Sequence, residues 1–154
     1  MNTDKPRSFM ETASVVGKLK HAAVSEAVIG AFYDVYNELG HGFLESVYRD
    51  ALAVVLLAKG LSVEREKAVQ VRFRGQTVGL FRTDLVVQQC VIVELKCARM
   101  LDRVHEAQLL NHLKATEFEV GLLLNFGTRP QFRRMLLDND QKKIRENLCQ
   151  SVVD

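Results

Sequence analysis

Two apolar runs within the segment 82–96 constrain the fold more than any other part of the sequence. The first run covers residues 85–87, and the second covers residues 91–95 with one interruption at Glu94. Both runs are rich in β-branched residues, which is typical of strands that are covered on both faces. Because the short polar stretch Gln88-Gln89 separates them, we expect two buried strands joined by a tight turn.

Three charged residues, Asp84, Glu94 and Lys96, lie inside or at the ends of these runs. A charge in a covered strand costs several kcal/mol unless it is paired or bound to a metal. Opposed residues of an antiparallel hairpin have a constant index sum, so a three-residue loop over Gln88–Cys90 would place Asp84 opposite Glu94. Lys96 would then share the face of Glu94. A two-residue loop would put the two acids on opposite faces.

Directly opposed carboxylates repel each other, so this arrangement favours a divalent cation between Asp84 and Glu94. Oxygen ligands of this kind predict Mg²⁺ or Mn²⁺. An alternative stays open in which these residues neither bind a metal nor catalyse a reaction. In that case Asp84 is an exposed acid at a strand end, beside a Glu–Lys ion pair across the strands.

Length and composition place the chain among ordinary globular proteins. It has 154 residues, enough for one domain with a core, and its net charge of +2 gives no strong nucleic-acid signal. No apolar run approaches the length of a membrane span, and no secretory hydrophobic segment is found, so we expect no membrane association. The cysteines are odd in number and lack CxxC spacing, which favours a reducing cytoplasm: Cys90, Cys97 and Cys149.

The chain is expected to hold one domain over residues 18–138. Residues 1–17 show no periodicity and are predicted to be a flexible lead, and residues 139–154 a polar helix or tail. Apolar residues at helical spacing predict helices over Leu19–Leu39, Leu44–Lys59 and Asp102–Thr116. Asp102 is the expected N-cap of the third helix.

The remaining periodic segments are predicted as strands, followed by one more helix. The strands cover Leu61–Glu66, Val69–Phe73, a segment from Thr77 through Asp84 into the central hairpin, and Phe118–Asn125. Thr128 and Pro130 are expected to open a final helix that carries Arg133 and Arg134. The order is α-α-β-β-β-β-α-β-α, and the strand after the third helix can return by a crossover to give one parallel pair in a mixed sheet.

With this order, Asp84, nine residues, then Glu94-Leu95-Lys96 resembles the signature of the PD-(D/E)XK nuclease superfamily, although Thr83 stands in place of the usual proline. The resemblance implies an α/β fold, a restriction-endonuclease-like mixed β-sheet flanked by helices with an α-β-β-β-α-β core. Gly42–Tyr48 is similar to the GxxExxY motif of one subgroup, and segments 107–114 and 121–127 resemble that subgroup too. The likeness covers about residues 24–135.

The resemblance also implies roles for individual residues. Asp84 and Glu94, with the Leu95 carbonyl, would hold Mg²⁺ or Mn²⁺, and Lys96 would orient a water and balance developing phosphoryl charge. Glu45 resembles a helical acid near the metal in such nucleases. Gln108 and His112 resemble the Gln-x-x-x-Tyr element of RecB-type nucleases, with histidine replacing tyrosine. Candidate phosphate contacts are Arg82, Arg99, Arg103, His112, Lys114, Arg133 and Arg134.

The function that these features imply is a metal-dependent nuclease that hydrolyses phosphodiester bonds, with DNA as the expected partner. Two alternatives stay open: a catalytically silent nuclease-like module that binds nucleic acid or protein, and a phosphohydrolase that acts on a nucleotide. A homo-oligomer is also left open by the sequence.

Overall fold

The structure, a computed structural model, describes residues 20–142. The flexible lead predicted over residues 1–17 lies outside the described residues, as does most of the tail predicted over residues 139–154. The helices in the described range are α2 (Ala22–Leu39), α3 (Glu45–Ala58), α4 (Arg103–Ala115) and the short 3-10 helix η1 (Asn139–Gln141). The strands are β1 (Val63–Arg65), β2 (Ala68–Phe73), β3 (Gln76–Arg82), β4 (Leu85–Val87), β5 (Val91–Lys96), β6 (Val120–Phe126) and β7 (Pro130–Leu136).

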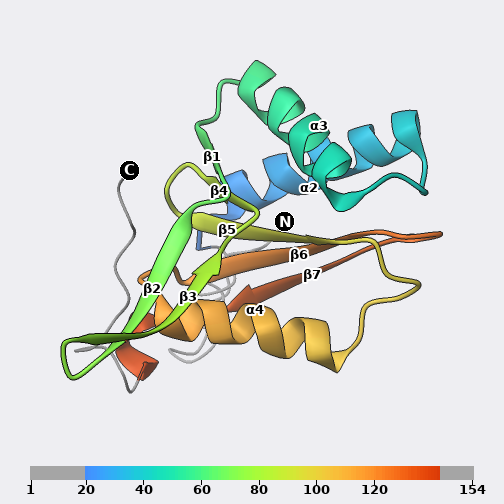
Figure 1. The fold of residues 1–154 in the computed structure, drawn as a ribbon. Helices are drawn as coiled ribbons and strands as arrows, with labels where there is room; N and C mark the ends of the chain where they lie inside the picture. Colours follow the sequence, from blue (N-terminus) through green and yellow to red (C-terminus); the bar gives the residue numbers. More distant parts are fainter. Residues whose placement is uncertain (1–19, 143–154) are drawn as a thin grey trace, which may run out of the picture.

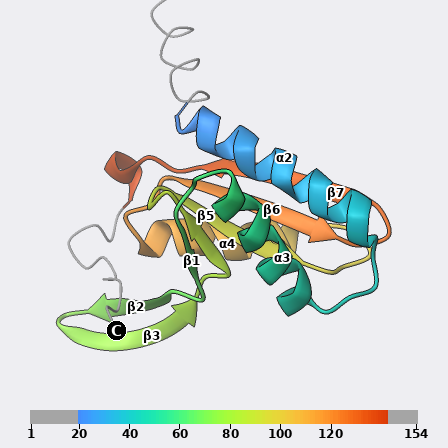
Figure 2. The same cartoon turned by 90° about the horizontal axis from the view of Figure 1, so that it is seen from above.

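Residues 20–142 form a five-stranded sheet in the order β1-β4-β5-β6-β7 and a separate two-stranded ribbon of β2 and β3. In the sheet β5 and β6 run parallel, as the crossover through α4 predicts, and the other neighbours are antiparallel. Helices α2 and α3 cover one face and α4 covers the other (Figure 1), and the view from above shows α2 and α3 side by side (Figure 2). The predicted mixed α/β fold with flanking helices is confirmed.

The central strand β5 explains the continuous apolar run, because its alternate residues enter two different cores. Val91, Val93 and Leu95 pack with α2 and α3, whereas Ile92 packs with Leu109 and other residues of α4. Burying an aliphatic side chain of this size stabilises the fold by roughly 1.5–3 kcal/mol. Glu94 shares the face of Ile92 and is 8% exposed, so it lies on the α4 side of the strand.

The predicted three-residue loop between the central strands is confirmed. Leu85 pairs with Val93 and Val87 with Val91, which leaves residues 88–90 as the loop. Gln88 and Gln89 both have positive φ values, 53° and 55°, and close this turn. The same register places Asp84, which precedes β4, across from Glu94.

The strand predicted to run from Thr77 through Asp84 is interrupted, which corrects the sequence interpretation. β3 ends at Arg82, and the chain bends before β4 begins. The facing chain bends too, at Glu66, whose φ is 52°. Backbone hydrogen bonds continue through the bend, from Glu66 N–H to Asp84 O and from Thr83 N–H to Lys67 O, both 3.0 Å. The sheet edge and the ribbon are therefore two halves of one bent hairpin, with Asp84 at the bend.

The final helix predicted to open at Thr128 and Pro130 is wrong. Residues 130–136 form β7, which pairs antiparallel with β6 from Pro130 opposite Phe126 to Leu136 opposite Val120. Proline is tolerated as the first residue of an edge strand as well as in the first turn of a helix. Because neighbours in a strand face opposite sides, Arg133 and Arg134 diverge instead of sharing a helix surface.

The helix ends agree with their local sequence signals. The Asp102 side chain accepts hydrogen bonds from Val104 N–H and His105 N–H at 2.9 and 3.3 Å, which confirms it as the N-cap of α4. Gly40 ends α2 with φ 67°, a conformation in which glycine carries no side-chain penalty. Within residues 20–142 no helix is both long and apolar enough to cross a membrane.

Candidate active site

Asp84 lies at the bend of the long hairpin and reaches the end of the central strand. Its Oδ2 atom accepts a hydrogen bond from Leu95 N–H at 2.7 Å. Because β4 begins only at Leu85, the Asp84 carboxylate takes the place of a strand backbone carbonyl as the acceptor for Leu95 N–H. The carboxylate of Asp84 is thus fixed beside the Glu94-Leu95-Lys96 segment that the sequence singled out.

Glu94 is a buried acid with a histidine partner. His112 on α4 places its Nδ1 atom 3.1 Å from Glu94 Oε2, and both side chains are nearly buried, at 13% and 10% exposed. Burial raises the pKa of Glu94 above its ordinary value, and the Asp84 carboxylate adds to this rise. The hydrogen bond from His112 and the charges of His112 and Lys96 oppose the rise without cancelling it.

Lys96 and Gln108 extend the same cluster toward solvent. The Lys96 ammonium donates a hydrogen bond of 2.9 Å to Gln108 Oε1. Gln108 lies one helical turn before His112 on α4, so the two residues that were matched to the Gln-x-x-x-Tyr element contact Lys96 and Glu94 respectively. Gln108 therefore points to the cluster.

Helix α3 brings Glu45 to the same end of β5. Cys97 Sγ lies 3.7 Å from Phe43 O in the loop before α3. Burial raises the pKa of the Cys97 thiol, and the negative charge of Glu45 adds to that rise, which places Glu45 near the residue that follows Lys96. Tyr48 anchors this end of the helix, because it is fully buried and its hydroxyl group donates to Gly40 O at 2.5 Å.

The predicted phosphate contacts are scattered. Arg82 is exposed and donates to Glu66 O at 3.1 Å. Arg99 and Arg103 are exposed in and after the loop that follows β5, and Lys114 is exposed near the end of α4. Arg133 lies 3.5 Å from Glu106 on the α4 side. Arg134 bonds Ser25 and the Lys20 carbonyl beside α2, so it faces away from the cluster.

Sequence reasoning missed three residues that support the cluster. Phe81 of the ribbon stacks on His112 with ring centroids 4.0 Å apart and planes 5° apart. The fully buried Asn125 bonds both backbone groups of Ala98 and so fixes the chain just after Lys96. Arg49, one turn after Glu45, lies 3.3 Å from Glu66 and is influenced by the charge of Asp84. An amide in an otherwise apolar strand was a usable signal for Asn125, whereas the other two contacts depend on tertiary packing.

Gly127 shows how closely the loop after Lys96 is held. A Cβ atom at Gly127 would lie 2.0 Å from Ala98 O, a distance that no real side chain allows. The backbone of β6 and the loop can meet only because position 127 is glycine. The Tyr36 hydroxyl group also donates to Gly127 O at 2.8 Å, which ties this corner to α2.

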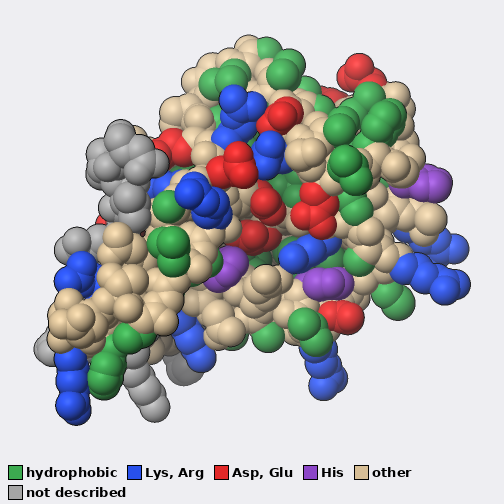
Figure 3. Space-filling model, in the orientation of Figure 1, with side chains coloured by type: hydrophobic (Ala, Val, Ile, Leu, Met, Phe, Trp, Pro, Cys, Tyr) green, Lys and Arg blue, Asp and Glu red, His purple; other side chains and the backbone are tan. Residues whose placement is uncertain are grey.

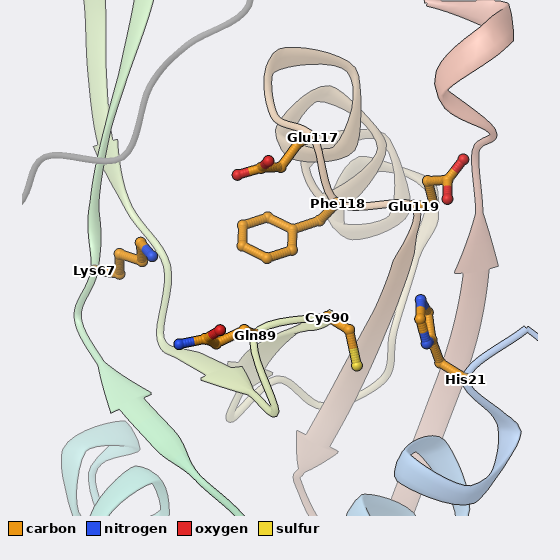
Figure 4. Close-up of a pocket in the computed structure, with 7 residues that line it drawn as sticks. All are labelled: His21, Lys67, Gln89, Cys90, Glu117, Phe118 and Glu119. Carbon is orange, nitrogen blue, oxygen red and sulfur yellow. The ribbon is translucent and has the colours of Figure 1, made fainter.

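A pocket of about 520 Å³ lies at the opposite end of the sheet from the cluster. Its walls come from the loop before β5, the residues before β6 and the start of α2, and include Cys90, Phe118 and His21 (Figure 4). Ligands of open α/β sheets bind outside the carboxyl ends of parallel strands, where Glu94 and Lys96 stand. We therefore assign the candidate active site to the cluster and not to this pocket.

The cluster fits a divalent cation by its donor chemistry. Acidic side chains gather at the centre of the face between α3 and α4, with basic and histidine side chains beside them (Figure 3). Among the described residues no group of three or more His, Cys, Asp or Glu side chains is arranged to hold a metal ion. The proposed set instead combines two carboxylates, Asp84 and Glu94, with a backbone oxygen, and such hard oxygen donors suit Mg²⁺ or Mn²⁺. Burial of Glu94 in the cluster makes a neighbouring positive charge favourable.

Three comparisons with known proteins were made, against solved structures, curated sequences and family profiles. One solved structure, "Crystal structure of SSO0001", aligns with a TM-score of 0.48 and 19% sequence identity. The alignment covers 82% of this chain and 63% of that chain, so the present chain spans less than two thirds of that protein's length. A comparison with curated protein sequences found no match.

The sequence profile of the PD-(D/E)XK nuclease superfamily matches residues 22–135, which span α2 to β7 and include the whole cluster. Members of this superfamily are generally hydrolytic nucleases, and membership supports a nuclease-like function for this chain. The chain belongs to the PD-(D/E)XK nuclease superfamily.

Proposed function

We propose that the chain is a Mg²⁺- or Mn²⁺-dependent deoxyribonuclease of the GxxExxY subgroup, with residues 18–138 as the nuclease domain. The observation that carries the proposal is the joint placement of Asp84 and Glu94 at the end of β5 with Lys96 held by Gln108. Two acids at one strand end can hold a metal ion, and a lysine beside them can balance the charge that develops on a phosphoryl group. The free thiols Cys90 and Cys97 support a reducing compartment, the cytoplasm.

The carboxylates of Asp84 and Glu94, with the Leu95 carbonyl, are the proposed metal ligands, and Glu45 is a further oxygen donor nearby. A cation bound there would polarise the scissile phosphate and lower the pKa of a water. The Leu95 N–H bond holds the Asp84 carboxylate in one orientation. The His112 ring holds the Glu94 carboxylate in the same way. A carboxylate that is already oriented loses less freedom when a ligand arrives.

Lys96 acts on the water and on the phosphoryl charge in this proposal. Its ammonium group has three donors, and one is directed to Gln108 at 2.9 Å, which leaves two for a water or a phosphate oxygen. Positive charge placed where negative charge develops lowers the barrier of the chemical step. Gln108 keeps the flexible lysine side chain near the cluster. The proposed phosphate contacts on this side are Arg82, Arg99, Arg103, His112, Lys114 and Arg133.

A catalytically silent interaction module is the second candidate, and one contact favours it. Glu94 already has a hydrogen-bond partner in His112, so the acid is partly satisfied without a metal. The two candidates differ in whether Mn²⁺ binds at Asp84 and Glu94 and in whether DNA is cut.

The test is incubation of the purified chain with linear, nicked and single-stranded DNA, with Mn²⁺ and with EDTA. The proposal predicts cleavage with Mn²⁺, none with EDTA, and much slower cleavage by Lys96→Ala under the same conditions. DNA that stays intact in every Mn²⁺ reaction would leave the silent module as the better account. Cleavage that survives in EDTA would contradict the metal requirement. Hydrolysis of a mononucleotide in a parallel Mn²⁺ reaction, with all three DNAs intact, would indicate a nucleotide phosphohydrolase.

A further inference from the structure

The two-stranded ribbon of β2 and β3 projects from the body of the molecule beside α4 (Figures 1 and 2). Its turn is Arg74-Gly75, with φ values of 51° and 78°, between the paired residues Phe73 and Gln76. Residues 73–78 at this tip are all exposed, whereas Ala68 and Val69 at the base are buried. The ribbon is thus fixed at one end and free at the other.

The ribbon carries a strong local charge in a chain that is almost neutral. Residues 67–83 contain four of the 21 lysines and arginines and none of the 19 acids: Lys67, Arg72, Arg74 and Arg82. Arg72 donates to Gly75 O at 2.7 Å, Arg82 donates to Glu66 O, and Arg74 lies over the Phe73 ring at 5.1 Å. Within the described residues none of these three arginines pairs with a carboxylate, so their charges are available to an anionic partner.

Large apolar side chains are exposed on the same ribbon. Phe73 is 53% exposed, Val78 62% and Leu80 65%. Apolar side chains interspersed with arginines suit a nucleic-acid groove, where thymine methyl groups and sugars offer apolar contacts between phosphates. A purely protective role for the arginines, as charges that keep an exposed strand edge from aggregating, does not account for this apolar exposure.

The base of the ribbon is packed against the candidate active site. Val69 and Ala115 of α4 form a small core with Val71 and Phe81. Phe81 also stacks on His112, the partner of Glu94. Arg82 is two residues from Asp84 along the chain. A ligand seated on the ribbon would therefore continue toward the acids.

We propose that the β2–β3 ribbon is a duplex-DNA docking arm that enters a groove and directs the phosphate backbone to the Asp84–Glu94 cluster. At roughly 3.3 Å per residue its strands extend for about 20 Å, and a two-stranded ribbon fits the major groove, which is about 12 Å wide. This inference rests on the proposed nuclease function, because that function is the reason for directing the bound DNA to the cluster. The arginines supply contacts to phosphates that are independent of sequence.

The test measures the affinity of the full chain for a short fluorescent DNA duplex in EDTA. Fluorescence anisotropy of the duplex monitors binding at several KCl concentrations. The variant is Arg72→Gln/Arg74→Gln, which removes the charge of the exposed Arg74 at the tip and that of the half-buried Arg72 beside it. We expect its affinity to fall by about tenfold or more and the slope of log K against log salt to become shallower by about 2, close to 0.9 per lost phosphate contact. Lys59→Gln, a solvent-facing change at the end of α3, is the control and should match the parent.

A second variant tests the apolar contacts without changing charge. Leu80→Ser should weaken duplex binding and leave the salt slope unchanged, because the slope reports only ionic contacts. The unfolding midpoints of all variants are compared with the parent, and the exposure of these side chains predicts little change. The parent should also bind the duplex more tightly than a single strand of the same sequence.

Several results would overturn the docking arm. They are a double variant that binds the duplex with the parent's affinity and salt slope, a parent that prefers the single strand, and a parent that binds no DNA and uses the ribbon for a protein. Because binding is measured without metal, an absence of Mn²⁺-dependent cleavage would overturn the proposed function and leave the arm standing. Parent-like binding and cleavage by the double variant would overturn the arm alone.

Discussion

The two ends of the central strands differ in how their charged side chains are arranged. At the carboxyl end of β5, Asp84 and Glu94 carry like charges, and burial with the Asp84 charge raises the pKa of Glu94. At the amino end, Lys20 lies 3.2 Å from Glu119 and 3.0 Å from Asp138, so the charges there are complementary. Burial by itself would raise the pKa of Glu119, but the hydrogen bonds from Asn139 N–H and Lys20 outweigh it and hold the pKa below its ordinary value.

The contrast separates a stabilising arrangement from one that stability alone does not explain. The ion pairs at the amino end favour the folded state, whereas the opposed acids at the carboxyl end act against it. Functional sites commonly retain such unfavourable groups at a cost in stability. The carboxyl end is therefore the place where a ligand of opposite charge would give the largest gain.

The largest expected effect is that of Lys96→Ala on cleavage. Loss of its positive charge should slow the chemical step by on the order of 10²-fold or more, because the proposed mechanism places the Lys96 ammonium beside the reacting phosphate. Single-turnover cleavage of linear DNA with saturating Mn²⁺ measures this step directly. A variant that cleaves like the parent would show that Lys96 is only an ion-pair partner. The carboxyl end would then differ less from the amino end in function than this account holds.

Glu94→Gln tests the cost of the buried acid. The isosteric amide can still bond His112 but carries no charge, so in EDTA at neutral pH it should raise the free energy of unfolding by about 1 kcal/mol. Urea unfolding of both proteins gives the difference. Because the folded-state pKa of Glu94 is raised, the parent loses stability as pH rises from the ordinary to the raised pKa, and the gain of the variant should grow over that interval. A variant less stable than the parent would contradict this account.

Glu119→Gln should have a smaller effect of opposite sign. The amide oxygen can still accept from Lys20, but removing the negative charge of this ion pair should lower the free energy of unfolding by about 0.5–1 kcal/mol at neutral pH. Since the folded-state pKa of Glu119 is lowered, its contribution is present above the ordinary pKa of a glutamate and disappears as pH falls through the lowered pKa. The exposed neighbour Glu117→Gln is the matched control. An effect that persists undiminished in acid would show that packing, not charge, is responsible.

The smallest effect is expected for His112→Tyr. A tyrosine ring can keep the stack on Phe81, and it restores the residue that the Gln-x-x-x-Tyr element has at this position. The kcat/KM for DNA cleavage should stay within about threefold of the parent, a barrier change below ~1 kcal/mol. Complete loss of activity with metal binding retained would show that His112 has chemistry of its own.

Much of the central fold was predictable from local patterns. Apolar residues at helical spacing predicted α2, α3 and α4, and the long apolar runs predicted β4, β5 and β6. The constant index sum of a hairpin predicted the loop over residues 88–90 and the opposition of Asp84 and Glu94. These features were accessible because each depends on residues close together in the chain.

Other features depend on contacts that no local pattern displays. The bend at Glu66 and Thr83 leaves the pairing register unchanged, so the sequence on either side reads as one strand. Pro130 begins an edge strand, although the same residue also suits the first turn of a helix. The stack of Phe81 on His112 joins the ribbon to α4 across 31 positions of sequence, and the location of Arg49 near Asp84 likewise requires the packed fold.

The most direct test of the central claim is a calorimetric titration of Mn²⁺ into the parent, Asp84→Asn and Lys96→Ala. If the opposed acids form a metal site, Asp84→Asn should lose most of the Mn²⁺ affinity, because the change preserves shape and deletes a charge that a hard cation needs. Lys96→Ala should bind Mn²⁺ as well as the parent or slightly more tightly, since it removes a neighbouring positive charge. Parent-like Mn²⁺ binding by Asp84→Asn would show that the metal lies elsewhere and would contradict the assignment of this end of the sheet as the active site.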